Sequence, residues 1–209
     1  MSTTWSPTDH SEFVTVTSTA ATRNSASGSA YQSARSNLAI NGPTYVQFTI
    51  TQVGSSEGTG PGMMVGLANG VASLNNYMGA DNNGCSYRNS GSVLKNAIAV
   101  TSPGTFTTGD VIGMAVDTNA KVVKFNKNGG TMSAGVDISA FGDELFISTS
   151  VGNGSTPPNV SVADAPMPPA PSIDLVGHGD SMSLTGNVRQ IWLSRLVQML
   201  RAANQPVGN

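Results

Sequence analysis

Charged side chains are scarce in this sequence. Asp, Glu, Lys and Arg make up 11% of its 209 residues, where about a quarter is usual for a soluble domain. The formal net charge is -2, and no segment of the chain is strongly basic. Binding to nucleic acid, or to an anionic membrane surface, requires clustered Lys and Arg to neutralise phosphates. We therefore expect neither as a partner.

Cysteine, histidine and long apolar runs are also scarce. Cys85 is the only cysteine, which excludes an intrachain disulfide. The two histidines, His10 and His178, have no carboxylates at metal-ligand spacing, so we expect no metal and no other cofactor. No apolar run is long enough to span a bilayer, and residues 1–13 lack the basic and then apolar order of a secretory signal. We expect no membrane insertion, and exit by lysis or another route if the protein acts outside a cell.

Gly, Ser, Thr and Asn are abundant, and an apolar fraction of 38% is enough for a core. Up to residue 163 the apolar residues fall in short runs, often alternating and rich in β-branched side chains. Clusters of Gly, Asn, Ser and Pro separate the runs, as in an antiparallel sandwich or barrel. The predicted strands cover residues 13–17, 44–53, 62–68, 96–100, 110–116, 121–125, 145–149 and 159–163.

One turn and one strand can be read in more detail. Asn128-Gly129 is the dipeptide that tolerates the positive φ angles of a type I′ turn. Just before it, Val123 and Phe125 alternate with polar residues, which predicts one buried and one solvated face. Asn126 belongs to the face that we expect to be solvated.

The pattern changes after residue 163. Residues 164–172 are rich in Pro and predict an extended linker. Residues 173–183 then predict a strand entering a turn, and residues 187–203 a helix with a broad apolar stripe. The stripe includes Trp192, Leu193, Leu196, Val197 and Leu200.

The β region resembles the SPRY family, whose fold is a bent, concanavalin-like antiparallel β-sandwich, in the form found in bacterial and phage proteins. The likeness covers roughly residues 3–163, and its most specific part is "TFTTGDVIGMAVDTNAKVVKFNKNGG" at 105–130. Further matching stretches are 3–17, 44–52, 62–69 and 77–93. Where many members carry an aromatic pair in the early strand, this chain has only Tyr45 and Phe48.

The SPRY resemblance implies a binding module without catalytic residues, whose loops at one end of the sandwich contact a protein or, less commonly, a glycan. The loop at 75–89 is the candidate rim. Its tyrosines offer aromatic platforms, and its amides and carboxylate offer the paired donors and acceptors that sugar hydroxyls need. The same Asn and Gly residues could instead simply form turns. The candidate binding residues are Asn75, Tyr77, Asp81, Asn82, Asn83 and Tyr87.

Residues 173–200 resemble the first sequence block of the SGNH (GDSL-type) hydrolases, in which a Gly-Asp-Ser turn follows the first strand. By that likeness Ser181 is the candidate nucleophile. A serine nucleophile needs a base within hydrogen-bond reach, and the family takes it from a late Asp-x-x-His that this sequence lacks. Nothing places His178 on Ser181, so we expect no active triad in this chain alone.

One strand and one amphipathic helix cannot bury their apolar faces by themselves. The segment 173–209 is therefore disordered in isolation, docked on the sandwich, or paired with copies or another chain. If the sequence is part of a longer protein, the missing partner is the rest of a hydrolase domain.

The sequence favours a non-enzymatic binding or structural module of a phage virion, in a tail fibre, spike or capsid-surface protein. Its expected partner is a host-surface glycan or protein, or another virion protein. Phage adhesins often join such sandwiches to esterase domains, which explains both resemblances. The alternative is the N-terminal portion of a carbohydrate O-acetylesterase that uses Ser181 with a His from outside this chain. An assembly role is a third possibility, in which the helix at 187–203 joins copies into a homo-oligomer.

Overall fold

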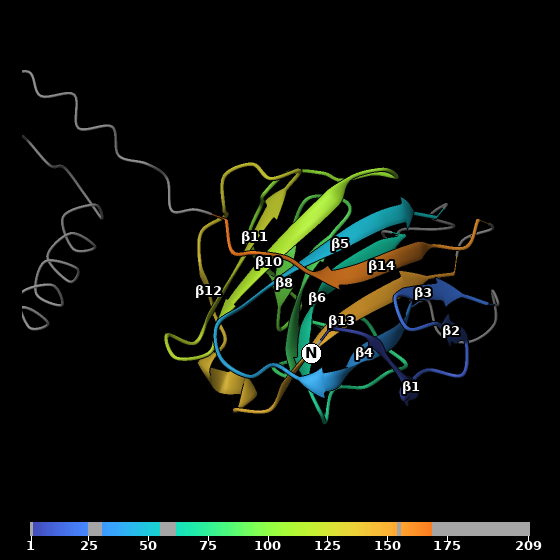
Figure 1. The fold of residues 1–209 in the computed structure, drawn as a ribbon, viewed down its shortest axis with the longest axis horizontal. Coiled ribbons are helices and arrows are strands. Elements are labelled where there is room, and N and C mark those ends of the chain that lie inside the picture. Colours follow the sequence, from blue (N-terminus) through green and yellow to red (C-terminus); the bar gives the residue numbers. More distant parts are fainter. Residues whose placement is uncertain (1, 25–30, 55–61, 154–155, 169–209) are drawn as a thin grey trace, which may run out of the picture. The chain divides into compact units, whose positions relative to one another are not determined.

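A computed structural model describes residues 2–24, 31–54, 62–153 and 156–168. Two seven-stranded antiparallel sheets form a sandwich (Figure 1). Sheet A contains, in spatial order, β1 (Trp5–His10), β4 (Tyr31–Ala39), β13 (Leu145–Gly152), β6 (Met63–Asn69), β7 (Gly84–Arg88), β8 (Val93–Lys95) and β9 (Ile98–Thr101). Sheet B contains β12 (Val136–Asp137), β11 (Val122–Lys127), β10 (Val111–Asp117), β5 (Thr44–Gln52), β14 (Asn159–Asp164), β3 (Ala20–Arg23) and β2 (Val14–Val16). One short 3-10 helix, η1 (Ser139–Phe141), precedes β13. The all-β prediction is confirmed.

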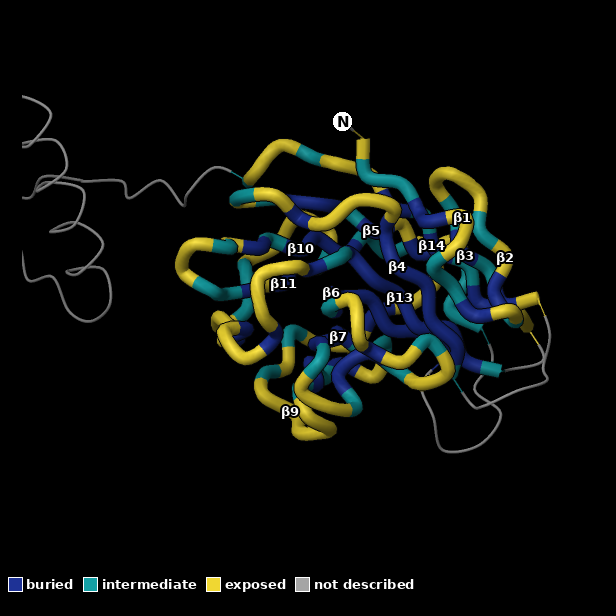
Figure 2. Tube along the Cα trace, turned by 90° about the horizontal axis from the view of Figure 1, so that it is seen from below, coloured by how far each residue is buried: buried dark blue, intermediate teal, exposed yellow. Residues whose placement is uncertain are grey.

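The core lies between the two sheets and follows the two-residue alternation of the strands. In β13, Leu145, Ile147 and Val151 join the core, while Ser148 and Ser150 point to the other face of sheet A. Figure 2 shows strands inside the sheets, β4 and β13 among them, as a buried band with exposed loops around it. Sheet A is therefore covered on both of its faces near its centre.

The strands with an apolar alternating pattern lie close to where the sequence predicts them. The type I′ turn is confirmed as well, because Asn128 and Gly129 have φ angles of 51° and 72°. The expectation that Asn126 is solvated is wrong. Asn126 is 1% exposed, and its amide donates to Gly130 O at 3.0 Å and accepts from the Tyr45 hydroxyl at 3.4 Å. The buried amide is tolerated because both of its polar atoms have partners.

The side chains of Tyr45 and Asn126 have room to meet only because residue 113 is a glycine. The Tyr45 hydroxyl and the Asn126 amide meet above Gly113 on β10. A Cβ at Gly113 would overlap both groups. Gly113, the second glycine of the Gly-Asp-Val-Ile-Gly stretch, is thus required by the close approach of these two side chains.

Other predictions fall wholly or partly beyond the described residues. β14 ends at Asp164, and residues 165–168 are irregular. Ser181 and His178 lie outside the described residues, as do the predicted helix at 187–203 and the predicted linker from residue 169 on. Within the described ranges, we find neither a helix that could cross a bilayer nor a group of three His, Cys, Asp or Glu side chains able to hold a metal ion.

Candidate functional site

The segment joining β6 to β7, residues 70–83 (the β6–β7 loop), covers the outer face of sheet A. A chain of hydrogen bonds attaches it there. The Met78 N–H donates to Ser150 Oγ at 2.9 Å, and the Ser150 and Ser33 hydroxyls are 2.8 Å apart. The Ser33 hydroxyl donates to Asn76 O at 2.7 Å. Since Ser33 donates its proton to the loop, the Ser150 hydroxyl is the donor between the two serines.

The outer face can accept a covering loop because its side chains are small. Neighbouring strands there present Ser148 of β13, Gly66 and Ala68 of β6, and Ser86 of β7. The Ser86 hydroxyl donates to the carbonyl oxygen of Met78. The Met78 side chain packs with Ala68 and Ala72 in a small apolar cluster separate from the main core. The polar face is therefore buried with its backbone and most hydroxyls bonded.

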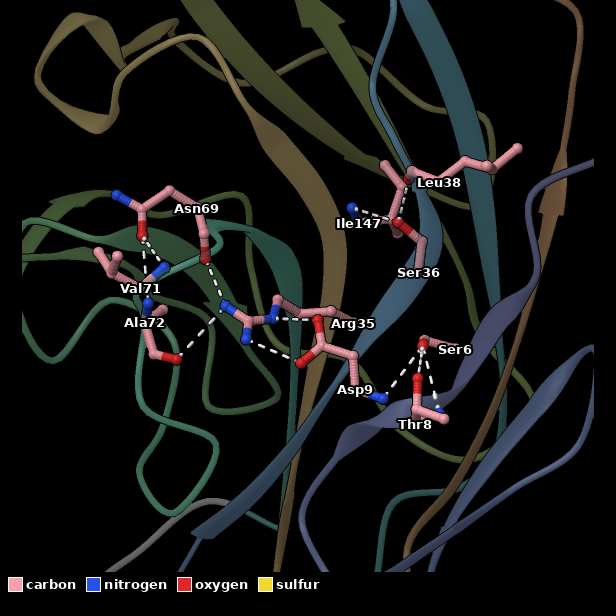
Figure 3. Close-up of polar contacts among 10 residues, drawn as sticks. All are labelled: Ser6, Thr8, Asp9, Arg35, Ser36, Leu38, Asn69, Val71, Ala72 and Ile147. Carbon is pink, nitrogen blue, oxygen red and sulfur yellow. Dashed lines mark hydrogen bonds and ion pairs between the residues drawn. The ribbon is translucent and has the colours of Figure 1, made fainter.

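Arg35 of β4 holds the base of the β6–β7 loop, and Figure 3 shows its guanidinium between Asp9 and the loop. Arg35 Nε and Nη2 donate to the two Asp9 carboxylate oxygens at 2.7 and 2.8 Å. Its Nη1 donates to the carbonyl oxygens of Asn69, at 2.5 Å, and Ala72, at 3.4 Å. The Asn69 side chain accepts from the N–H groups of Val71 and Ala72 at 3.1 Å each. Arg35 thus joins β1, β4 and the loop.

The tip of the loop, residues 75–77, brings Tyr77 against Tyr31, the first residue of β4. Their ring centroids are 5.5 Å apart with the planes at 71°, an edge-to-face contact. Both tyrosines are half-buried, and Asn75 beside them is exposed. The Asn75 side-chain oxygen accepts from the Ser11 hydroxyl at 3.3 Å. The tip therefore presents two aromatic rings and an amide at the surface.

Arg88, the last residue of β7, lies on the same face as the tip. It is opposite Met64 on β6, which is opposite Ser150 on β13, which is opposite Ser33 on β4. Arg88 is half-buried, and its Nε is buried without a hydrogen-bond partner. Burial raises the pKa of Tyr31 to about 12, while the positive charge of Arg88 lowers it and the Tyr77 hydroxyl raises it. This electrostatic effect agrees with the register of sheet A, which puts Arg88 on the same face as Ser33 of β4.

The other half of the loop forms a tight turn away from the tip. The Asp81 carboxylate accepts from the backbone N–H and the side-chain amide of Asn83 at 2.8 and 2.9 Å. The Asn83 side-chain oxygen accepts from the Asn69 amide at 3.2 Å. Asp81 and Asn83 thus use polar groups to shape the loop, and Asn82 between them is exposed.

A sequence profile of the SPRY domain matches residues 45–159. This chain belongs to the SPRY family. The SPRY domain of human HERC1 has a similar structure, with a TM-score of 0.64 and 22% identity over 78% of this chain and 99% of that chain. A human SPRY domain matches with a TM-score of 0.53 and 18% identity, over 73% of this chain and 95% of that chain. Stonustoxin matches with a TM-score of 0.55 and 11% identity, over 79% of this chain and 27% of that chain. At these identities the likeness of the structures shows the fold alone.

No curated protein matches the sequence. SPRY domains typically serve as non-catalytic modules for protein interactions, and the family match supports that general role here. The phage type and the hydrolase likeness of residues 173–200 have no counterpart among these matches.

Tyr87 lies in the core of the SPRY domain, so its interpretation as a surface platform is wrong. It is 0% exposed, and its ring centroid is 5.1 Å from that of Phe106 and 5.7 Å from that of Phe125. Its hydroxyl donates to Gly104 O. Burial, with a smaller effect of the Asp110 charge, raises its pKa to about 12. Alternation in β7 points Tyr87 inward and Arg88 outward.

The structure therefore brings together only part of the predicted site. Asn75 and Tyr77 lie at the tip, while Asp81, Asn82 and Asn83 form the separate turn. Sequence reasoning missed Tyr31 and Arg88. Arg88 could have been noticed as a cation in a charge-poor sequence, whereas nothing in the sequence puts Tyr31 beside a loop that comes two strands later.

Proposed function

We propose that this SPRY domain is a non-enzymatic recognition module of a phage virion, in a tail fibre, spike or capsid-surface protein. Its binding surface is the tip of the β6–β7 loop, and its partner is a host-surface glycan or another virion protein. The observation that carries the proposal is the pairing of Tyr77 with Tyr31 beside Asn75 on a loop attached by buried hydrogen bonds. A surface ordered before binding loses less conformational freedom on binding.

The chemistry of the tip suits a sugar. Glycan sites combine aromatic surface with a few placed polar groups, and Tyr31, Tyr77 and Asn75 offer both. The virion setting is supported by the resemblance of residues 173–200 to the start of an esterase, since phage adhesins often pair the two kinds of domain. The low charge of the chain fits the same setting.

A glycan array and a host-cell retention assay test the proposal. Tyr77→Ala removes one ring of the tip and is expected to abolish most retention. Asn82→Ala is the matched control, since it removes an exposed amide from the other half of the same loop. Retention unchanged by Tyr77→Ala, or lost equally in both variants, would exclude the tip as the binding surface.

The second candidate function is that of an enzyme, the N-terminal portion of a carbohydrate O-acetylesterase with Ser181 as nucleophile. The Gly179-Asp180-Ser181 sequence after a predicted strand favours it. It needs a catalytic His from outside this chain. Hydrolysis of p-nitrophenyl acetate by the wild type and by Ser181→Ala tests it, and equal rates would end it for this chain.

Residues 173–209 also support a proposed assembly role. The helix predicted at 187–203 would join copies of the chain into a homo-oligomer on the virion through its apolar stripe. Deleting residues 172–209 and measuring the mass by light scattering tests this role. An unchanged oligomeric state would contradict it. The residues involved are Trp192, Leu193, Leu196, Val197 and Leu200.

A further inference from the structure

Three arginines lie among the described residues, Arg23, Arg35 and Arg88. Of these, only Arg88 has a side chain that forms no hydrogen bond or ion pair with another described residue. Arg35 is paired with Asp9. Arg23 is buried, donates to Val151 O at 3.5 Å and lies over the Phe13 ring. Arg88, by contrast, is half-buried with its Nε withdrawn from water and unbonded. A guanidinium stays charged at any ordinary pH, so within the described residues the Nε of a half-buried cation is left without a hydrogen-bond partner.

Three of the described carboxylates are engaged with other residues. Asp9 binds Arg35, Asp81 binds Asn83, and Asp110 accepts from Asn128 and Thr107. No ion pair among the described residues includes Arg88. A guanidinium is built to bind a carboxylate through two parallel hydrogen bonds. No carboxylate of the described residues uses this capacity of Arg88, which suits an acidic ligand.

Arg88 lies on the same outer face of sheet A as the serines that hold the loop tip. The register of sheet A puts Arg88, Ser150 and Ser33 on one line across the outer face, and Ser33 holds the tip through Asn76. The electrostatic effect of Arg88 on the Tyr31 hydroxyl agrees with that placement. A ligand that contacts the tyrosine pair can therefore reach the guanidinium.

The residue types on this face suit a sugar. Glycan sites combine aromatic surface with a few placed polar groups. The loop tip offers the two half-buried tyrosine rings of Tyr31 and Tyr77, with the exposed amides of Asn75 and Asn76 beside them.

We propose that Arg88 binds the carboxylate of an acidic sugar while Tyr31 and Tyr77 contact the sugar ring next to it. This inference rests on the proposed function in its glycan form. It adds that the recognised glycan is acidic and that Arg88 selects for the acid.

Binding of the full 209-residue chain to uronic-acid and sialic-acid oligosaccharides, and to the same oligosaccharides with reduced carboxyl groups, tests the inference. The acidic forms are expected to bind about tenfold or more tightly than the reduced forms, as for the loss of one charged pair. Changing the ligand leaves the protein untouched, so this comparison does not depend on a variant folding.

Arg88→Gln provides the second arm. It is expected to bind acidic and reduced forms equally, at the wild-type affinity for the reduced form. Arg88→Lys is expected to restore part of the preference, because lysine keeps the charge without the two-pronged geometry. Thermal unfolding midpoints close to the wild type confirm that the variants fold.

The outcomes separate the two proposals. Equal affinity of the wild type for acidic and reduced forms would overturn the role of Arg88 while leaving the glycan site intact. No binding to any glycan would overturn the glycan form of the proposed function. Tighter binding of oligoglutamate than of every acidic glycan would also overturn the inference, since it would identify an acidic peptide as the ligand.

Discussion

The two faces of sheet A are buried by different means. The inner face packs apolar side chains such as Leu67, Ile147 and Val151 against sheet B. The outer face buries Ser33, Ser150 and their neighbours under the β6–β7 loop through hydrogen bonds. Apolar burial stabilises the whole sandwich in proportion to area, whereas each hydrogen bond contributes little net free energy and requires one geometry.

This difference indicates a division of roles. The inner face accounts for most of the stability of the domain, and the outer face fixes the position of a loop whose tip carries the candidate site. Substitutions on the two faces are therefore expected to differ in kind. Inner-face changes should destabilise the whole domain, and outer-face changes should release the loop.

The largest effect is expected from the apolar core that the inner face of sheet A forms with sheet B. Phe125 on β11 is 0% exposed and contacts Tyr87, so Phe125→Ala is expected to cost about 3–5 kcal/mol of the free energy of unfolding. Urea unfolding followed by circular dichroism measures the change. Lys124→Ala on the exposed side of the same strand is the control, with an expected change within about 0.5 kcal/mol. A cost for Phe125→Ala no greater than the control's would refute the importance of the inner face.

Arg35→Met should give the next largest effect, on the outer face. It leaves the Asp9 carboxylate and the carbonyl oxygens of Asn69 and Ala72 without their donor. Breaking a fully buried ion pair costs more, but Asp9 is one-third exposed, so we expect a cost of about 2–3 kcal/mol. Hydrogen exchange should increase in residues 70–83 before it increases in the core strands.

A double-mutant cycle with Asp9→Asn separates the ion pair from the contacts to the loop. Asp9→Asn alone leaves the bonds from Arg35 to the loop in place, so it should cost less than Arg35→Met. Uniform hydrogen exchange across the domain in Arg35→Met would contradict a local role for this side chain.

Two serines of one strand sharpen the comparison further. Ser150 receives the Met78 N–H and contacts Ser33, whereas the buried Ser148 hydroxyl has no partner within the described residues. Ser150→Ala is expected to cost about 1–2 kcal/mol, since it orphans a buried N–H. Ser148→Ala should be neutral or stabilising, since it removes an unsatisfied polar atom. Equal costs in urea unfolding would show that the hydrogen bonds to the loop do not matter.

The comparison also explains which parts of the fold the sequence predicts. The β10–β11 hairpin is readable because Val123 and Phe125 alternate with polar residues and a turn signal follows. The same reasoning does not find β4, although β4 pairs with β1 on one side and with β13 on the other. Its residues Ser33 and Arg35 are buried under a loop, and a polar run carries no apolar period to detect.

The candidate site divides in the same way. Asn75 and Tyr77 are predictable because they lie in an evident loop, but the side chains that complete the surface come from strand ends. In β7 a one-residue difference in register would exchange Tyr87 and Arg88 between core and surface. Two adjacent small or polar residues, Cys85 and Ser86, give no apolar pattern that fixes the register. Only the packing of Tyr87 with Phe106 in the folded domain decides it.

The smallest expected effect concerns the turn that supports the far half of the loop. The Ala97 N–H donates to Gly79 O at 2.7 Å, and Ala97 itself has a φ of 59° in the β8–β9 turn. A left-handed conformation costs a residue with a Cβ about 1–2 kcal/mol, and glycine regains most of it at the expense of a more flexible unfolded chain. Ala97→Gly is therefore expected to stabilise the domain by about 0.5–1 kcal/mol in urea unfolding.

Gly109→Ala, at a φ of 90° with open space around it, is the reverse control and should destabilise. Because the tip is held from β4 and β13, glycan binding should be the same in Ala97→Gly as in the wild type; an altered affinity would mean that the two halves of the loop do not act separately.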